Sequence, residues 1–242
     1  MELTSKIILV VGGASGIGRA TVELCTALGA KVILADVDEK AGALVAQKTG
    51  AKFIRVDLAD EASIIAMYRQ IDATYSKLDV LLHCAGILLG AFIPLEEFST
   101  DTFRKVIEIN TTGCFLSAKY AFPLLKKAGK GVIILVSSGA ATGGSSSFAY
   151  GSSKGGVHSL GIVLANSLAV DNIRVNVLAP GGIDTPLKRS VIAADVQRKG
   201  HPDEFEKAVV DSNLGTPEGV AKVLAWLASD DADYVRGVIT TR

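Results

Sequence analysis

A tyrosine and a lysine in the second half of the chain have the spacing of an acid–base pair. Tyr150 and Lys154 are four residues apart, and apolar residues then repeat at helical spacing as far as Leu168. Residues four apart lie on one face of a helix, so the two side chains should point the same way. A free phenol has a pKa near ~10, and a neighbouring ammonium stabilises the phenolate so that it exchanges protons near neutrality. The pair predicts general acid–base chemistry.

A glycine-rich turn near the N-terminus is a second candidate element. It follows an apolar run at 6–11 and opens a helical pattern, with Gly12, Gly16 and Gly18 in a GxxxGxG arrangement around Ser15 and Ile17. Glycine permits a tight turn and lets backbone amides approach a pyrophosphate at the positive end of a helix. Because glycine clusters also form plain loops, the turn predicts a dinucleotide site only together with other features of the chain.

Asp36 stands at the end of the next apolar run and bears on which dinucleotide would bind. A carboxylate there can accept hydrogen bonds from the adenosine ribose hydroxyls and would repel a 2′-phosphate. The next residue is Val37, and neither Arg nor Lys stands in the glycine turn before Gly16, so a cationic partner for a 2′-phosphate is missing. This favours NAD over NADP; the alternative is that Asp36 is a solvated residue at a strand end.

Short apolar runs alternate with helical patterns along the chain. Strands are expected at 6–11, 31–35, 52–56, 78–83, 131–137, 172–178 and 236–241. Strands that are apolar along most of their length are typical of a parallel sheet covered by helices on both faces. We therefore predict an α/β protein: a three-layer, doubly wound Rossmann fold with a mostly or wholly parallel sheet of about seven strands. Residues 1–242 should form one domain, and the long irregular stretch 180–213 should be a substrate-binding lid.

Composition excludes several classes of partner. Lys plus Arg and Asp plus Glu are 25 each, so no overall basic charge attracts nucleic acid. The apolar stretches, such as 7–11 and 132–136, are far shorter than the ~20 residues that span a bilayer, so no membrane partner is expected. The N-terminus lacks a signal-peptide pattern, which predicts a cytoplasmic protein. The three cysteines contain no CxxC pair, so neither a disulfide framework nor a metal site is indicated.

These motifs together resemble the short-chain dehydrogenase/reductase family in its single-domain form. The resemblance covers nearly the whole chain and rests on the glycine turn, Asp36, Asp57 with Leu58, Ala85 with Gly86, Asn110, Ser137 with Ser138, the YxxxK motif of Tyr150 and Lys154, and Pro180 with Gly181. A YxxxK motif alone is common. Its place after a strand ending in Ser-Ser, in a chain with this glycine turn, is highly specific.

The resemblance implies an NAD-dependent enzyme that interconverts a secondary alcohol and a ketone by hydride transfer. Tyr150 would be the general acid/base, Lys154 would bind the nicotinamide ribose and stabilise the phenolate, and Ser138 would hydrogen-bond the substrate oxygen. Asn110 would anchor a water for proton relay. Ser137 competes with Ser138, which we choose because the second serine occupies the catalytic place in the motif. The implied cofactor-binding residues are Gly12, Ser15, Gly16, Ile17, Gly18, Asp36, Asp57, Leu58, Cys84, Ala85, Gly86, Tyr150, Lys154, Pro180, Gly181, Ile183 and Thr185.

The chain departs from the family pattern at three places. Val11 replaces a threonine before the first glycine, and His83 with Cys84 replaces an Asn pair; we expect altered stability or cofactor affinity rather than lost chemistry. The last strand ends without the family's Gly-containing tail, which affects the expected pocket edge and subunit interface. The family also implies a homodimer or homotetramer packed through the Tyr150 helix. The glycines of that helix, Gly155, Gly156 and Gly161, agree with close helix approach.

Two other functions compete with this interpretation. Ser153 lies in a GxSxG pattern with Asp184 and His201 following, as in a serine hydrolase, but no apolar strand directly precedes it. A non-catalytic, NAD-binding regulatory module should have a broken catalytic set, whereas all four expected catalytic residues are present. The substrate is not named by any motif; an apolar pocket is suggested by Leu88, Leu89, Phe92, Phe148 and Leu187.

Overall fold

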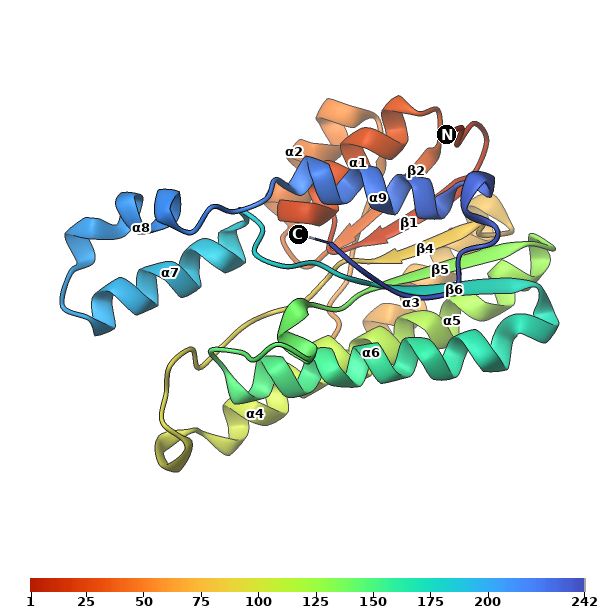
Figure 1. Ribbon diagram of the computed structural model, residues 1–242. Coiled ribbons are helices and arrows are strands. Elements are labelled where there is room, and N and C mark those ends of the chain that lie inside the picture. Colours follow the sequence, from red (N-terminus) through yellow and green to blue (C-terminus); the bar gives the residue numbers. More distant parts are fainter. Residues whose placement is uncertain (242) are drawn as a thin grey trace.

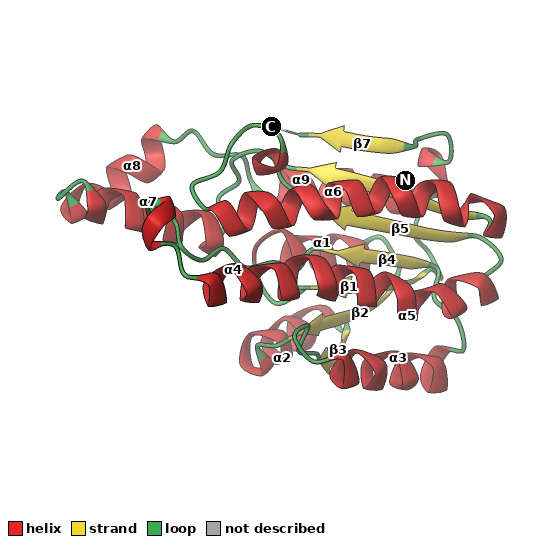
Figure 2. Cartoon of the chain, turned by 90° about the horizontal axis from the view of Figure 1, so that it is seen from below, coloured by secondary structure: helices red, strands yellow, loops and turns green. Residues whose placement is uncertain are grey.

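Seven parallel strands form the centre of the molecule, in the spatial order β3-β2-β1-β4-β5-β6-β7 (Figure 2). The computed structural model describes residues 1–241. The strands are β1 (Ile7–Val11), β2 (Lys31–Asp36), β3 (Lys52–Arg55), β4 (Val80–His83), β5 (Gly131–Val136), β6 (Ile173–Ala179) and β7 (Gly237–Thr240). The bounds of each strand lie within two residues of those expected. The predicted doubly wound fold is confirmed, and its sheet is wholly parallel.

Helices cover both faces of this sheet (Figure 1). One face carries α1 (Gly16–Ala27), α2 (Glu39–Thr49) and α9 (Pro217–Ala228); the other carries α3 (Glu61–Tyr75), α4 (Thr100–Ile107), α5 (Gly113–Lys127) and α6 (Phe148–Leu168). All five residues of β1 are buried. Leu9 packs in the core beneath α3 and α5, whereas Val10 packs beneath α1 and α9. Because each buried aliphatic side chain contributes about 1.5–3 kcal/mol, the two cores hold the layers together.

The order of the strands creates a crevice between β1 and β4. The chain adds β2 and β3 on one side of β1 and then returns to place β4 on the other side. The connections leaving β1 and β4 therefore diverge at the carboxyl edge of the sheet, which is where ligands bind in folds of this type. The glycine turn follows β1, and Ala85 with Gly86 follows β4.

Residues 180–213 are not the irregular stretch that we expected. They contain α7 (Pro186–Arg198) and α8 (Phe205–Asp211), which extend away from the sheet as an arm (Figure 1). Thr185 caps α7 by accepting a hydrogen bond from the Lys188 N–H, and Pro186 occupies its first turn. The arm is tied at its base because the Asp184 N–H bonds to the Gly215 carbonyl at 2.8 Å.

Within residues 1–241, none of the helices combines the length and the apolar character that crossing a membrane requires.

Candidate active site

A cleft of about 610 Å³ opens at the carboxyl edge of the sheet, over the crevice between β1 and β4. Every residue expected to bind the cofactor lines it, from Gly12 in the glycine turn to Thr185 at the base of the arm, and so does Ser138. Asn110, by contrast, is fully buried and does not line the cleft. The lining also includes residues that we did not single out as binding residues, among them Ile87, Lys188 and Val191.

The glycines of the turn bring its backbone close to the cleft. Gly12 has φ +82°, and a Cβ atom there would lie 2.6 Å from the backbone of Ala85. A Cβ atom on Gly18 would lie 1.9 Å from the Gly12 carbonyl oxygen. The side chain of Ser15, which precedes α1, makes no capping hydrogen bond, so the first N–H groups of α1 stay available to a ligand. This geometry fits a pyrophosphate at the start of α1.

Asp36 both lines the cleft and braces the glycine turn. One carboxylate oxygen accepts a hydrogen bond from the Ala14 N–H at 2.9 Å, and the other accepts one from the Asp38 N–H at 3.1 Å. The expectation that Asp36 faces the ligand site therefore holds, but its bracing role was not visible in the sequence. No local pattern links residues 14 and 36; the fold brings them together.

Tyr150 and Lys154 lie in the first two turns of α6, on the face toward the cleft. The Lys154 ammonium lies 5.9 Å from the centroid of the Tyr150 ring and donates a hydrogen bond to the Val136 carbonyl oxygen at 2.9 Å. Only 3% of Lys154 is exposed. A Cβ atom on Gly86 would lie 3.0 Å from the Lys154 Nζ, so this glycine makes room for the ammonium. The two side chains lie close together on one face of α6, as their spacing in the sequence predicted.

The two neighbouring serines have different surroundings. The buried Ser137 donates its hydroxyl hydrogen bond to the Lys154 carbonyl oxygen at 2.8 Å. The Ser138 hydroxyl accepts one from the Ala140 N–H at 3.1 Å and, among residues 1–241, donates none. Ser138 is therefore the serine whose hydroxyl proton is free to reach a ligand.

Asn110 lies in a π-helix (Glu108–Thr112) between α4 and α5, and it is fully buried. Its amide exchanges two hydrogen bonds with the backbone of Ile87, at 2.8 and 2.9 Å, and donates a third to the Ser153 hydroxyl at 2.9 Å. The side chain thus ties the segment after β4 to α6. We did not foresee the contacts with Ile87 and Ser153, because residues 87, 110 and 153 meet only in the folded chain.

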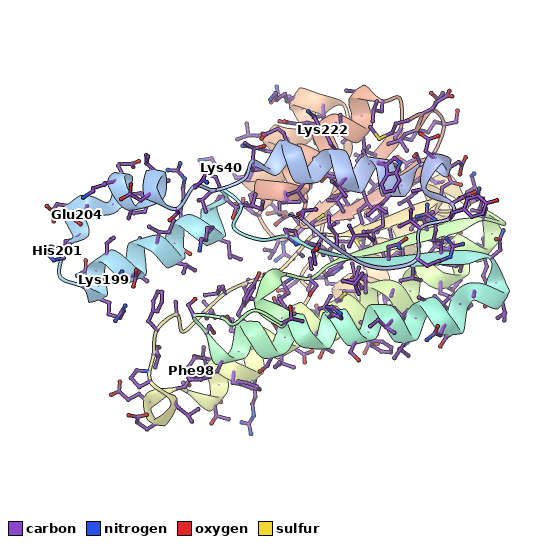
Figure 3. All side chains as sticks on the ribbon, in the orientation of Figure 1. Lys40, Phe98, Lys199, His201, Glu204 and Lys222 are labelled. Carbon is purple, nitrogen blue, oxygen red and sulfur yellow. The ribbon has the colours of Figure 1, made fainter. Side chains whose placement is uncertain are left out.

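The serine hydrolase hypothesis is wrong in its geometry. Ser153 is fully buried within α6 and donates its hydroxyl hydrogen bond to the Tyr150 carbonyl oxygen at 2.8 Å. Asp184 is paired with Arg189 at 2.6 Å. His201 lies at the far end of the arm, beyond α7 (Figure 3). The three residues do not form a triad.

His83 and Cys84, which replace the Asn pair of the family, are poor candidates for reactive groups. His83 is 1% exposed, and neither ring nitrogen has a hydrogen-bond partner among the described residues. Burial, together with the positive charge of Lys154, lowers the pKa of His83 to about 3, so the ring stays neutral. Burial raises the pKa of the Cys84 thiol to about 12, which removes the reactive thiolate.

The three glycines of α6 differ in what surrounds them. A Cβ atom on Gly161 would lie 2.1 Å from the Val177 side chain in β6, and one on Gly156 would lie 3.0 Å from Thr111. These two glycines allow α6 to approach other parts of its own chain. Gly155 faces open space.

Together, a doubly wound sheet, a glycine turn at the start of α1 and a paired tyrosine and lysine define a dinucleotide-dependent oxidoreductase. Comparison with known proteins agrees. A family model described as Enoyl-(Acyl carrier protein) reductase matches residues 12–241. The chain belongs to the short-chain dehydrogenase/reductase family, whose members use nicotinamide cofactors, and it is an oxidoreductase acting on CH–OH groups.

Individual relatives match over nearly their full length. The chain is 38% identical to cis-4-hydroxycyclohexanecarboxylate dehydrogenase of Sinomonas cyclohexanicum, over 97% of this chain and 93% of the relative. It is 35% identical to 2,5-dichloro-2,5-cyclohexadiene-1,4-diol dehydrogenase of Sphingobium indicum, over 98% of this chain and 94% of the relative. The crystal structure of levodione reductase superposes with a TM-score of 0.88 at 30% identity, covering 99% of this chain and 96% of that one.

Proposed function

We propose that the chain is an NAD-dependent dehydrogenase that interconverts a secondary alcohol on an aliphatic ring and the corresponding ketone, with Tyr150 as general acid/base. The observation that carries this proposal is the Lys154 ammonium, which is buried beside the Tyr150 ring and has no carboxylate partner among residues 1–241. A positive charge in that position stabilises the phenolate that must accept a proton from the alcohol.

The proposed reaction uses the two free hydroxyl groups of the cleft. During oxidation the Tyr150 phenolate takes the hydroxyl proton of the alcohol, while Ser138 donates a hydrogen bond to the same oxygen. A bound nicotinamide cofactor would supply the acceptor for the hydride of the substrate carbon atom. Lys154 would also bind the nicotinamide ribose. Asn110 would position α6 against the segment after β4, as its bonds to Ser153 and Ile87 suggest. The water relay expected at Asn110 stays a proposal.

NAD is the proposed cofactor because the Asp36 carboxylate lines the cleft and forms no ion pair among residues 1–241. Its carboxylate would accept hydrogen bonds from the ribose hydroxyls and repel a 2′-phosphate. Asp57 would contact adenine. The nicotinamide carboxamide would reach Ile183 and Thr185. A non-catalytic NAD-binding module is less well supported, because the described cleft holds a complete acid–base set.

The substrate class is suggested by the cleft and by the relatives. The cleft lining includes Leu88 after β4 and Leu187 and Val191 on α7, and these apolar side chains suit an apolar ring. Two relatives are named for alcohols on six-membered carbon rings. Leu89 and Phe148 are 38% and 47% exposed and lie outside the lining, and Phe92 lies beneath the Arg198 guanidinium instead. The apolar pocket is therefore narrower than we expected.

A panel assay tests the proposed function. Cyclic and open-chain secondary alcohols are offered with NAD and with NADP, and nicotinamide reduction is followed by absorbance. We expect turnover of cyclic alcohols with NAD. No turnover of any alcohol or ketone with either cofactor, or hydrolysis of esters in their place, would contradict the proposal.

We also propose a single-domain, cytoplasmic protein that forms a dimer or tetramer and uses segment 180–213 to bind substrate. Three free cysteines fit a reducing compartment. The outer faces of α4, α5 and α6 expose the apolar side chains of Phe103, Phe115, Ile162 and Val163. Exposed apolar side chains on neighbouring helices suit a subunit contact. Small-angle scattering should give at least twice the monomer mass, and Val163→Glu should lower it; a monomeric wild-type mass would contradict the oligomer.

A further inference from the structure

Lys188 is a cation in the cleft that the proposed reaction does not use. It lies in the first turn of α7, is partly exposed and lines the cleft. Within residues 1–241 its ammonium has no ion pair and no hydrogen bond to a side chain. The next residue, Arg189, is paired with Asp184 at 2.6 and 2.9 Å. The Lys188 ammonium is therefore available to bind a ligand.

The first turn of α7 lies directly against the glycine turn. A Cβ atom on Gly16, the first residue of α1, would lie 3.2 Å from the Thr185 methyl carbon and 3.9 Å from the Pro186 Cδ. The Lys188 N–H bonds to the Thr185 hydroxyl at 3.2 Å. The amino-terminal ends of α1 and α7 therefore meet at one place in the cleft, and Lys188 lies one turn from it.

The charged side chains around this place favour a bound anion, since the carboxylate of Asp184, which precedes the α7 cap, is already paired with Arg189. Residues 12–18 include no charged side chain, and Arg19 is exposed outside the cleft lining. The first turn of α7 contains no acidic residue. A lysine at the amino-terminal end of a helix is repelled by the helix dipole, by about 0.3–1 kcal/mol, unless an anion is bound nearby. The two acidic residues of the lining lie elsewhere: Asp36 ends β2, and Asp57 follows β3.

We propose that Lys188 binds a phosphate oxygen of the dinucleotide's pyrophosphate from the α7 side, opposite the N–H groups of α1. The inference rests on the proposed cofactor binding and applies to NAD and NADP alike. It has a structural consequence, because Lys188 belongs to the arm: a bound pyrophosphate would hold the first turn of α7 against α1 and restrain residues 186–211 beside the cleft.

Binding of cofactor fragments tests this role without turnover. ADP-ribose contains the pyrophosphate, and adenosine does not. Calorimetry of Lys188→Ala should show ADP-ribose bound roughly 10-fold to 100-fold more weakly than by the wild type, since a charge-assisted hydrogen bond is lost. Adenosine affinity should not change, and Lys188→Arg should restore most of the ADP-ribose affinity. The control is Lys222→Ala, because Lys222 is an exposed lysine on α9 outside the cleft (Figure 3).

Hydrogen exchange provides a second measurement. ADP-ribose should slow amide exchange in residues 186–211 of the wild type and much less in Lys188→Ala. Equal ADP-ribose affinity in Lys188→Ala and the wild type would overturn the proposal. So would a selective rise in KM for a carboxylate-bearing ring alcohol, relative to its neutral analogue, at unchanged ADP-ribose affinity, because Lys188 would then bind the substrate. A wild type that binds neither ADP-ribose nor NAD would instead contradict the proposed function itself.

Discussion

The Lys154 ammonium donates a hydrogen bond to the Val136 carbonyl oxygen at 2.9 Å, and this bond joins α6 to the end of β5. It fixes the charge beside the Tyr150 ring, in the space that Gly86 leaves open. A buried ammonium without a carboxylate partner costs stability, so its presence at this point suits a role in chemistry rather than in folding.

Replacing Lys154 should separate these two roles. Lys154→Met removes the charge and keeps the chain length, so turnover should fall by at least 100-fold while stability to urea stays equal or rises. Lys154→Arg keeps the charge, but its larger guanidinium does not fit beside Gly86 and should restore little activity. Turnover and urea unfolding are measured on the same samples. Near-normal turnover in Lys154→Met would show that the ammonium has no part in proton transfer.

Asp36 should set cofactor preference and also support the glycine turn. Asp36→Asn keeps one acceptor oxygen for the Ala14 or Asp38 N–H and removes the charge, so the ratio of kcat/KM for NADP to that for NAD should rise at least 10-fold. Asp36→Ala removes both acceptors and should weaken binding of both dinucleotides, because the turn loses its brace. An unchanged NAD preference in Asp36→Asn would refute the assigned role.

His83 should make the protein sensitive to acid. Burial lowers the pKa of His83 from 6.5 to about 3, so the unfolded chain binds a proton that the folded chain does not. The contribution of neutral His83 to the free energy of unfolding is therefore complete above pH 6.5 and is lost as the pH falls from 6.5 toward 3. Between pH 7.5 and pH 5 the free energy of unfolding should drop by about 2 kcal/mol from this group.

Urea unfolding at the two pH values measures this drop. In His83→Asn the difference between pH 7.5 and pH 5 should shrink by about that amount. His201→Asn is the control, because His201 is exposed on the arm and should leave the difference unchanged. An equal pH dependence in His83→Asn and the wild type would mean that His83 is protonated in the folded protein.

Two glycines of α6 form a matched pair for packing. Gly161→Ala places a Cβ atom 2.1 Å from the Val177 side chain and should destabilise the fold by about 1–3 kcal/mol. Gly155→Ala meets no atom within 4 Å and should leave stability unchanged or raise it by up to ~1 kcal/mol. Thermal unfolding of both variants measures these changes in stability. Equal effects would mean that α6 does not lie against β6 as described.

The parts of the fold that could be predicted are those indicated by short, continuous stretches of sequence. β1 and β5 are uninterrupted apolar runs, and the glycine turn follows β1 directly. Segment 180–213 is singled out by the sequence but its helices are not, although Thr185 and Pro186 form a standard helix start, because α7 buries only Val191, Ile192 and Val196 and has weak periodicity. Contacts such as Asn110 with Ser153 depend on the packing of distant segments, which a sequence pattern does not contain.

The central claim is that Tyr150 transfers the proton, and Tyr150→Phe tests it most directly. The variant keeps the ring beside Lys154 and loses only the hydroxyl group, so NAD affinity by fluorescence titration should stay within a few-fold of wild type. Turnover of a cyclic secondary alcohol should fall by at least 1,000-fold, within the range that general acid–base catalysis supplies. Tyr234→Phe, at a fully exposed tyrosine, should match the wild type. Turnover by Tyr150→Phe within 10-fold of wild type would contradict the account.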